Sequence, residues 1–179
     1  MPRSGHAQLP VTGWPQLRGR LRRPRTGGVH GFRWDHGTFT TVDVRDATAT
    51  FPFGINNRGQ IVGVYVDAHG DYHGFYRDRN GAVTTLPDAP GAAPAVGGTQ
   101  PTAINEHGQI VGTAATAEGA SRGFVYQHGV YTPIDGPHAV YTRALDINNA
   151  GQIVGDYGTE PPTGTRSPSL RRPEPARSL

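Results

Sequence analysis

The stretch GINNRGQIVG, residues 54–63, occurs twice more in this chain, as AINEHGQIVG at residues 103–112 and as DINNAGQIVG at residues 146–155. The three copies share the pattern I-N-x-x-G-Q-I-V-G and begin 49 and 43 residues apart. Self-similarity at such a period is typical of propellers, solenoids and other repeat arrays. We therefore expect a short array of repeated units and no single catalytic cleft.

A second block, a Gly-Phe pair after a basic residue, follows the first two copies at a constant distance. HGF (residues 73–75) begins ten residues after Gly63, RGF (residues 122–124) begins ten residues after Gly112, and HGF (residues 30–32) opens the repeated region. Each block leads into a glycine-bearing turn and then into a Thr-containing apolar run. Turn residues between two such runs predict a β-hairpin.

Each unit is thus predicted to contain four short strands. Strand one ends at the Ile-Asn pair, strand two holds Gln-Ile-Val-Gly, strand three holds Gly-Phe and strand four is the Thr-containing run. In the Asn-x-x-Gly link, the Asn side chain is expected to bond backbone two residues on, and the Gly to take a positive φ. Strand two is apolar on both faces, with Ile61 on one and Val62 on the other, which predicts burial between stacked sheets.

The repeated positions are all interpreted as structural. The mid-strand glycines Gly63, Gly112 and Gly155 are expected to let neighbouring blades approach closely. The glutamines are expected to bond the backbone of the adjoining blade. The signature positions are Ile55, Asn56, Gly59, Gln60 and Gly63; Ile104, Asn105, Gly108, Gln109 and Gly112; Ile147, Asn148, Gly151, Gln152 and Gly155; and the pairs Gly31 and Phe32, Gly74 and Phe75, and Gly123 and Phe124.

These motifs resemble the HAF repeat, a family named for a His-Ala-Phe-type triplet and described as an extracellular repeat of bacteria. The resemblance covers residues 29–158, with Gly as the middle residue of the triplet and Arg122 in place of one His. It implies a propeller-like, exported protein with no established enzymatic activity, and it carries over no catalytic residue. Four strands in 43 to 49 residues also match the length of a propeller blade.

The predicted fold class is all-β, a β-propeller-like array of four-stranded antiparallel blades that is incomplete. Strands three and four of one unit (residues 29–44) precede two full units, and strands one and two of another (residues 140–157) follow them. Propellers have four to eight blades, so a closed monomer is not expected. Three hypotheses remain: a fragment of a longer propeller, a truncated non-functional relic, or copies that associate to close a ring.

Charge divides the chain into three predicted segments. Residues 1–27 hold six Arg and no acid, residues 28–158 hold seven Arg and twelve acids, and residues 159–179 hold four Arg and two acids. We expect 1–27 and 159–179 to be disordered Arg/Pro-rich ends around a repeat domain at 28–158. No nucleic-acid module accompanies the basic ends, so nucleic acid is not an expected partner.

Other classes of protein find little support in the sequence. The chain has no cysteine, no apolar run long enough for a membrane span, and no secretory signal in the residues given, so an extracellular location rests on the resemblance alone. No nucleophile elbow, P-loop or zinc-binding motif appears, and we expect no catalytic residue, no cofactor and no metal ligand. An enzyme with its site in a propeller channel is the less favoured alternative.

Two residue types invited a chemical interpretation. Histidines recur near turns, including His30 and His73, and a ring of them around a channel would bind a metal or an anion; we favour a structural role. Asp43 and Asp135 occupy equivalent positions after strand four, and we expect them to cap a turn. The loops at 88–100, 115–121 and 136–142 vary most between units. Variable loops on a repeated frame are where we expect a protein or glycan ligand to bind.

Overall fold

The structure, a computed structural model, describes residues 28–160, and this part of the chain is built from twelve β-strands and one short 3₁₀ helix. The expectations for residues 1–27 and 161–179 lie outside it. The elements are β1 (Gly31–Asp35), β2 (Thr38–Val42), β3 (Ala49–Ile55), β4 (Ile61–Val66), β5 (Tyr72–Arg77), β6 (Val83–Thr85), η1 (Pro94–Val96), β7 (Thr99–Ile104), β8 (Ile110–Ala115), β9 (Ser121–Gln127), β10 (Val130–Ile134), β11 (Tyr141–Ile147) and β12 (Ile153–Gly158). The predicted all-β class is confirmed.

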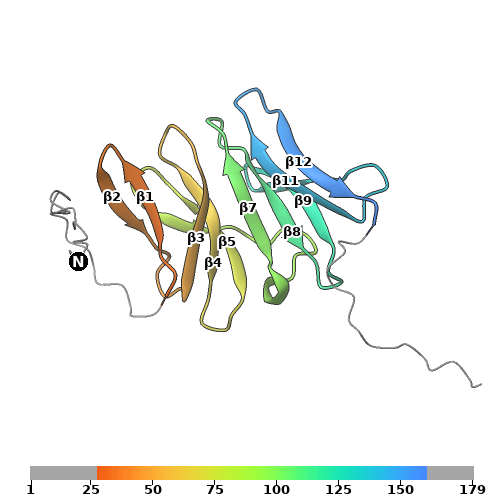
Figure 1. Ribbon diagram of the computed structural model, residues 1–179, viewed down its shortest axis with the longest axis horizontal. Helices are drawn as coiled ribbons and strands as arrows, with labels where there is room; N and C mark the ends of the chain where they lie inside the picture. Colours follow the sequence, from red (N-terminus) through yellow and green to blue (C-terminus); the bar gives the residue numbers. More distant parts are fainter. Residues whose placement is uncertain (1–27, 161–179) are drawn as a thin grey trace, which may run out of the picture.

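The strands form antiparallel sheets that follow one another in chain order (Figure 1). Strands β3 to β6 make a four-stranded sheet, and β7 to β10 pair consecutively within a six-stranded sheet that also holds β11 and β12. The β1–β2 hairpin lies before them and the β11–β12 hairpin after them, the latter joined to β9 through a single parallel pair, Tyr141 with Ser121. The predicted antiparallel sheets are present, and no sheet closes on itself within residues 28–160.

Apolar layers fill the spaces between consecutive sheets. Ile61 packs with Val42 and Phe75 between β1–β2 and β3–β6. Val62, its neighbour in β4, faces the other way and packs with Ile104 between β3–β6 and β7–β10. The side chains of Ile61 and Val62 are 2% and 0% exposed. The prediction that strand two is buried on both faces is confirmed for β4 and β8, whereas in β12 Val154 is 64% exposed.

The Asn-x-x-Gly links form the predicted hairpin turns. In the first, Asn56 Oδ1 accepts hydrogen bonds from the backbone N–H of Arg58 and of Gln60, both at 3.1 Å, and Gly59 has φ +73°. The turns at Asn105 and Asn148 have the same bonds. These contacts lie within a few residues of each other in sequence, which is why the local pattern predicts them.

The same asparagines also join neighbouring sheets, a role that was predicted for the glutamines. Asn56 Nδ2 donates to the backbone O of Asn105 at 3.0 Å, and Asn105 Nδ2 donates to the backbone O of Asn148 at 3.1 Å. The prediction for the glutamines is wrong. Gln60 Oε1 instead accepts from Asn56 within its own turn, at 2.7 Å, and Gln60 Nε2 donates to a tyrosine hydroxyl of its own sheet. The glutamine therefore bonds within its own turn, and the asparagine makes the contact with the next sheet.

The next residue of each turn extends this row of contacts. The N–H of Asn57 donates to Glu106 Oε1 at 2.7 Å, and the N–H of Glu106 donates to Asn149 Oδ1 at 3.0 Å. We call the two rows together the asparagine ladder. The ladder runs in one direction, from each turn to the turn of the following sheet.

The mid-strand glycines do not mark the approach of neighbouring sheets, so that prediction is also wrong. A Cβ on Gly63 would collide with the backbone O of Phe51, in β3 of the same sheet, and would lie 2.9 Å from the Phe75 ring. A bulge in β3 between Pro52 and Gly54 produces this crowding, and bulges recur in β7 and β11. Gly112 and Gly155 meet the corresponding backbone oxygens.

The close approach between sheets occurs at the glycine of the Gly-Phe pair. A Cβ on Gly74 would lie 3.0 Å from Cδ of Pro101 in the next sheet, and a Cβ on Gly31 would overlap the ring of Pro52. Glycine therefore stands at the middle of the triplet because the following strand one passes directly over it.

Candidate ligand-binding pocket

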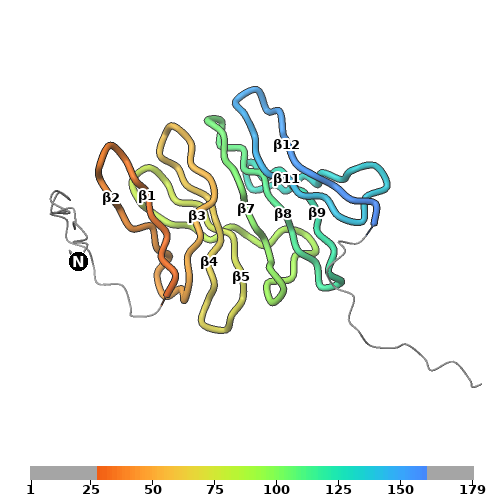
Figure 2. Tube along the Cα trace, in the orientation of Figure 1, coloured from red at the N-terminus to blue at the C-terminus, as the bar shows by residue number. Residues whose placement is uncertain are grey.

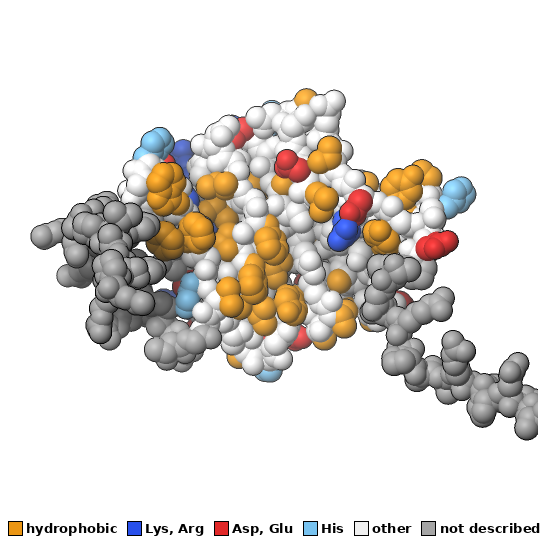
Figure 3. Space-filling model, in the orientation of Figure 1, with side chains coloured by type: hydrophobic (Ala, Val, Ile, Leu, Met, Phe, Trp, Pro, Cys, Tyr) orange, Lys and Arg blue, Asp and Glu red, His pale blue; other side chains and the backbone are white. Residues whose placement is uncertain are grey.

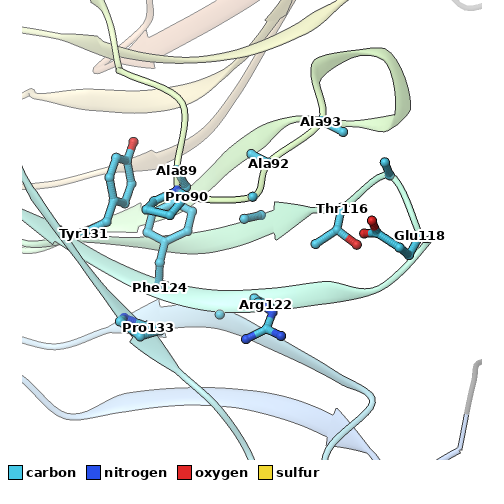
Figure 4. Close-up of a pocket in the computed structure, with 14 residues that line it drawn as sticks. Ala89, Pro90, Ala92, Ala93, Thr116, Glu118, Arg122, Phe124, Tyr131 and Pro133 are labelled. Atoms are coloured by element: carbon cyan, nitrogen blue, oxygen red, sulfur yellow. The ribbon is translucent and has the colours of Figure 1, made fainter.

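A pocket of about 590 Å³ lies between the loop that joins β6 to β7 and the sheet β7–β10 (Figure 4). Two of the three variable loops, 88–100 and 115–121, line it, while the third borders a smaller recess of about 320 Å³. The lining residues are Ala89, Pro90, Gly91, Ala92, Ala93, Ala114, Thr116, Ala117, Glu118, Arg122, Gly123, Phe124, Tyr131 and Pro133. Loops 88–100 and 115–121 are those in which the sequence predicts a ligand site, whereas Ala114, Tyr131 and Pro133 carried no such prediction, and Gly123 and Phe124 were interpreted as structural.

Hydrogen bonds hold the β6–β7 loop over the sheet. The backbone N–H of Ala93 donates to the backbone O of Ala115 at 2.8 Å, and the N–H of Ala89 donates to Thr99 Oγ1 at 2.8 Å. From β10, the Tyr131 hydroxyl donates to the backbone O of Pro87 at 2.6 Å. The pocket is therefore formed without a ligand, as most small-molecule and peptide sites are.

Two aromatic side chains form the apolar end of the pocket. The rings of Phe124 and Tyr131 meet edge to face with centroids 5.1 Å apart, and Tyr126 packs on Tyr131 at 4.5 Å. Burial of its hydroxyl raises the pKa of Tyr131 far above its usual value of 10, so this group stays neutral and serves as a hydrogen-bond donor to the loop.

The pocket exists because the second full sheet carries alanine where the first carries tyrosine. Ala114 in β8 pairs with Arg122, just as Tyr65 in β4 pairs with His73, so the two positions are equivalent. The Tyr65 ring packs on the His73 ring at 5.2 Å and its hydroxyl contacts Thr85 Oγ1 at 3.1 Å. The short Ala114 side chain leaves the corresponding space empty.

A polar edge borders this space. The Thr116 hydroxyl is buried and makes no well-directed hydrogen bond to any described residue. Glu118 stands beside it, and the pKa of its carboxyl is lowered, first by its own backbone N–H and then by the Thr116 hydroxyl. Arg122 lies across the pocket mouth, with Nη1 3.9 Å from Asp135 Oδ2. The pocket thus offers an apolar interior, one hydroxyl with bonding capacity left, and one charge of each sign at its edge.

The histidine and aspartate candidates take part in ion pairs within their own sheets. His30 Nδ1 lies 2.9 Å from Asp43 Oδ2, in the same relation as Arg122 to Asp135, while His73 faces Asp67. The carboxylates of Asp43 and Asp135 therefore face a basic side chain of strand three, where we had expected them to cap a turn. Within residues 28–160, no group of three or more His, Cys, Asp and Glu side chains is placed to hold a metal ion.

Three threonines were missed that belong to the frame. The backbone N–H of Val44 donates to Thr50 Oγ1 at 3.2 Å, and Thr99 and Thr142 accept from the preceding unit in the same way, at 2.8 and 2.9 Å. All three are buried. The sequence held a signal for them, because a Thr stands six residues before the signature Asn in every copy.

A scan against models of protein families, a search of curated proteins and a search of solved structures each returned no match to this chain. The part of the chain that the structure describes also contains no helix of the length and apolar character that crossing a membrane requires.

Proposed function

We propose that this chain is a non-enzymatic binding module built on HAF-type repeats in an exported bacterial protein, and that the pocket beside Ala114 binds a short segment of another protein. One observation carries the proposal: the two loops that differ most between the units converge on one cavity of a frame that is otherwise repeated. Function on repeat frames resides in such variable loops.

The chemistry of the walls favours a peptide over a glycan. Alanine, proline and two aromatic rings form most of the lining, and the polar groups are confined to Thr116, Glu118 and Arg122 at one edge. A sugar needs hydrogen bonds around its whole ring, because each buried hydroxyl without a partner costs free energy. A small apolar side chain of a peptide fills the interior, and the peptide backbone reaches the Thr116 hydroxyl and the charges of Glu118 and Arg122.

The arrangement offers little for catalysis. Within the described residues, Glu118 lies at the pocket edge, Asp135 faces Arg122, Asp88 lies close enough to Tyr131 to act on its pKa, and no histidine lines the pocket. General acid–base catalysis needs a pair of groups within hydrogen-bond reach of one reacting atom. A binding role uses every feature of the pocket, whereas an enzymatic role lacks its groups.

The test uses the full chain with two probes, a phage-displayed library of random peptides and a glycan array. We expect selection of peptides with a small apolar residue next to a charged one. The variant Ala114→Tyr should abolish their binding, because it introduces the side chain that the chain already carries at position 65. The matched control is Ala82→Tyr, at an exposed alanine in the β5–β6 turn, which should bind as the wild type does.

Circular dichroism and unfolding curves show whether each variant is folded. Peptides whose binding survives Ala114→Tyr would place the ligand elsewhere and contradict the proposal. Selection of glycans in place of peptides would contradict the assigned ligand class, and a folded chain that selects neither would contradict the binding role.

A further inference from the structure

The two ends of the array hold complementary half sheets. β1–β2 at the start corresponds to strands three and four of a unit, and β11–β12 at the end corresponds to strands one and two (Figure 2). In both complete sheets, strand two pairs with strand three, as β4 with β5 and β8 with β9. Among residues 28–160, nothing pairs with β12 on the side away from β11, and β1 pairs in a ladder only with β2.

The phenylalanine of strand three is buried in the two complete sheets and exposed in the half sheet β1–β2. Phe75 pairs with Gly63 and is 0% exposed, and Phe124 pairs with Gly112 and is 3% exposed. Phe32, the equivalent residue in β1, is 57% exposed. Gly155, the equivalent glycine in β12, is also exposed, and the three atoms nearest to a Cβ built on it all belong to Arg143 and Ala144, whereas a phenylalanine ring is among them at Gly63 and Gly112. The chain therefore holds both halves of a third phenylalanine–glycine contact at opposite ends.

A second contact joins an isoleucine of strand one to a valine of strand two in the preceding sheet. Its two halves also lie at opposite ends of the array. Ile104 packs in one buried cluster with Val62, and Ile147 packs in another with Val111. Ile55, the equivalent isoleucine of β3, is 55% exposed, and Val154, the equivalent valine of β12, is 64% exposed. A contact between Ile55 and Val154 would cover the exposed surface of both side chains. Figure 3 shows hydrophobic side chains in patches over the end that holds β1 to β3.

The asparagine ladder is open at both ends. Each turn donates to the turn that follows, so the last turn has donors to spare: Asn148 Nδ2, which bonds only Gln152 among the described residues, and the N–H of Asn149. The first turn has the matching acceptors, the backbone O of Asn56 and the side-chain oxygen of Asn57. A turn that followed Asn148 with the geometry of the first turn would continue both rows.

We propose that two copies of this chain associate head to tail, with β1–β2 of each copy completing the sheet begun by β11–β12 of the other. The register follows from the complete sheets: Gly155 of one copy opposes Phe32 of the second, Val154 packs on its Ile55, and Asn148 and Asn149 donate to its Asn56 and Asn57. Made at both ends, these contacts close an array of six four-stranded sheets, within the range of four to eight found in propellers. A head-to-tail contact gives a ring when its rotation closes and an open filament when it does not.

Burial of one charged pair is compatible with this contact. Asp156 stands at the position of Val64 in the complete sheet, so it would be covered. Its carboxylate accepts from the guanidinium of Arg143, with Nε at 2.7 Å from Oδ1, and this pairing lowers the pKa of Asp156. A carboxylate already paired in a bidentate manner loses less on desolvation than a free one.

The first test is the mass of the full chain in solution, by sedimentation or light scattering. We expect twice the chain mass of 19.1 kDa. Val154→Arg and Ile55→Asp should each give a folded monomer, because each places a charge on an exposed residue of the proposed contact. The double variant should restore the dimer, since the guanidinium introduced in one copy would then face the carboxylate introduced in the second. The matched control is Val130→Arg, at a valine that is 62% exposed and lies outside the contact.

A second test exploits the absence of cysteine from the chain. The variant with Ile55→Cys and Val154→Cys should form a covalent dimer on mild oxidation, and the variant with Ile55→Cys and Val130→Cys should not. A monomeric wild type would overturn the proposal, as would a dimer that Val154→Arg leaves intact. Larger polymers would overturn closure by two copies. None of these outcomes depends on the peptide pocket, which the Ala114→Tyr variant tests separately.

Discussion

The sheets β3–β6 and β7–β10 share every element of their frame and differ at one corner. Both have the Asn-Gly turn, the bulge over a mid-strand glycine and the buried phenylalanine. At the corner, the first sheet has Tyr65 where the second has Ala114. The second sheet has a pocket of about 590 Å³ at this corner. The site thus arises where a shorter side chain lies beside two loops that differ between the units.

The polar groups of the same corner differ as well. In the first sheet, the Asp67 carboxylate accepts from the backbone N–H of His69 at 2.7 Å and of Asp71 at 3.0 Å. In the second sheet, Thr116 occupies that place, and its buried hydroxyl makes no well-directed hydrogen bond to a described residue. The Asp67 carboxylate at the first corner is hydrogen-bonded within the chain, whereas the Thr116 hydroxyl at the second corner can still bond a ligand.

The largest effect is expected where the two sheets are the same. Gly63→Ala and Gly112→Ala should each destabilise the fold by about 3 kcal/mol or more, because the new Cβ would meet a backbone oxygen that cannot move away. Urea unfolding measures both. Gly37→Ala, at an exposed glycine with φ +85° and no atom within 4 Å of a new Cβ, should cost only about 1 to 2 kcal/mol. A mild effect at only one of the two mid-strand positions would show that the frames are not equivalent.

The ladder asparagines come next. Asn105→Ala should cost about 2 to 3 kcal/mol, because Asn105 is 3% exposed and its loss leaves buried backbone groups without partners. Asn148→Ala should cost less than about 1 kcal/mol, since this side chain is exposed and has no following turn in the described chain. Both are measured by urea unfolding in the Val154→Arg background, which removes association. Equal losses at the two positions would refute a role for the bond between sheets.

An exchange of the corner residues sharpens the contrast between the sheets. Tyr65→Ala should cost about 2 kcal/mol, through loss of the packing on His73 and of the contact with Thr85, and should open a second pocket. Ala114→Tyr should change stability by less than about 1 kcal/mol, because the ring enters space that is already empty. Thermal unfolding measures the stabilities. A severe loss for Ala114→Tyr would mean that the two corners are not interchangeable.

The smallest effect concerns pH. Backbone hydrogen bonds, first that from Asp71, lower the pKa of Asp67 from 3.8 to about 2. The folded value lies below the unfolded one, so the stabilisation is complete above about pH 4 and is lost as the pH falls toward 2. Asp67→Thr, which copies the second sheet, should therefore lower the midpoint of thermal unfolding at neutral pH. Its difference from the wild type should shrink between about pH 4 and pH 2. A constant difference across that range would contradict the assigned role of the carboxylate.

The units, their four strands and their turns could be predicted from the sequence because each depends on neighbours in the chain. The bonds from Asn56 Oδ1 reach only two and four residues on, and the positive φ of Gly59 belongs to the same turn. Successive side chains such as Ile61 and Val62 point to opposite sides of any strand. Because both are apolar, the sequence predicted that strand two is buried on both faces. Fold class and unit boundaries followed from such local patterns.

The roles of the glycines and glutamines could not be predicted, because they depend on which strand lies nearby in space. Gly63 is crowded by a bulge of β3, and no residue of β4 indicates that the bulge exists. Gln60 and Asn56 have the same amide group, so sequence alone did not tell which of them reaches the next sheet. The pocket is likewise a property of three segments that meet only in the fold.

By itself, the sequence determined that the protein is an array of four-stranded units with hairpin turns, because backbone conformation and side-chain alternation are governed by contacts within a few residues. Only the tertiary structure decided how one sheet meets the next, through the asparagine ladder, the buried threonines and the proline over Gly74. It also decided that the space beside Ala114 stays open and that Phe32 and Gly155 lie unpartnered at opposite ends of the described chain. The asparagine bonds join residues 49 and 43 positions apart, and the geometry of all these contacts depends on the relative position of whole sheets.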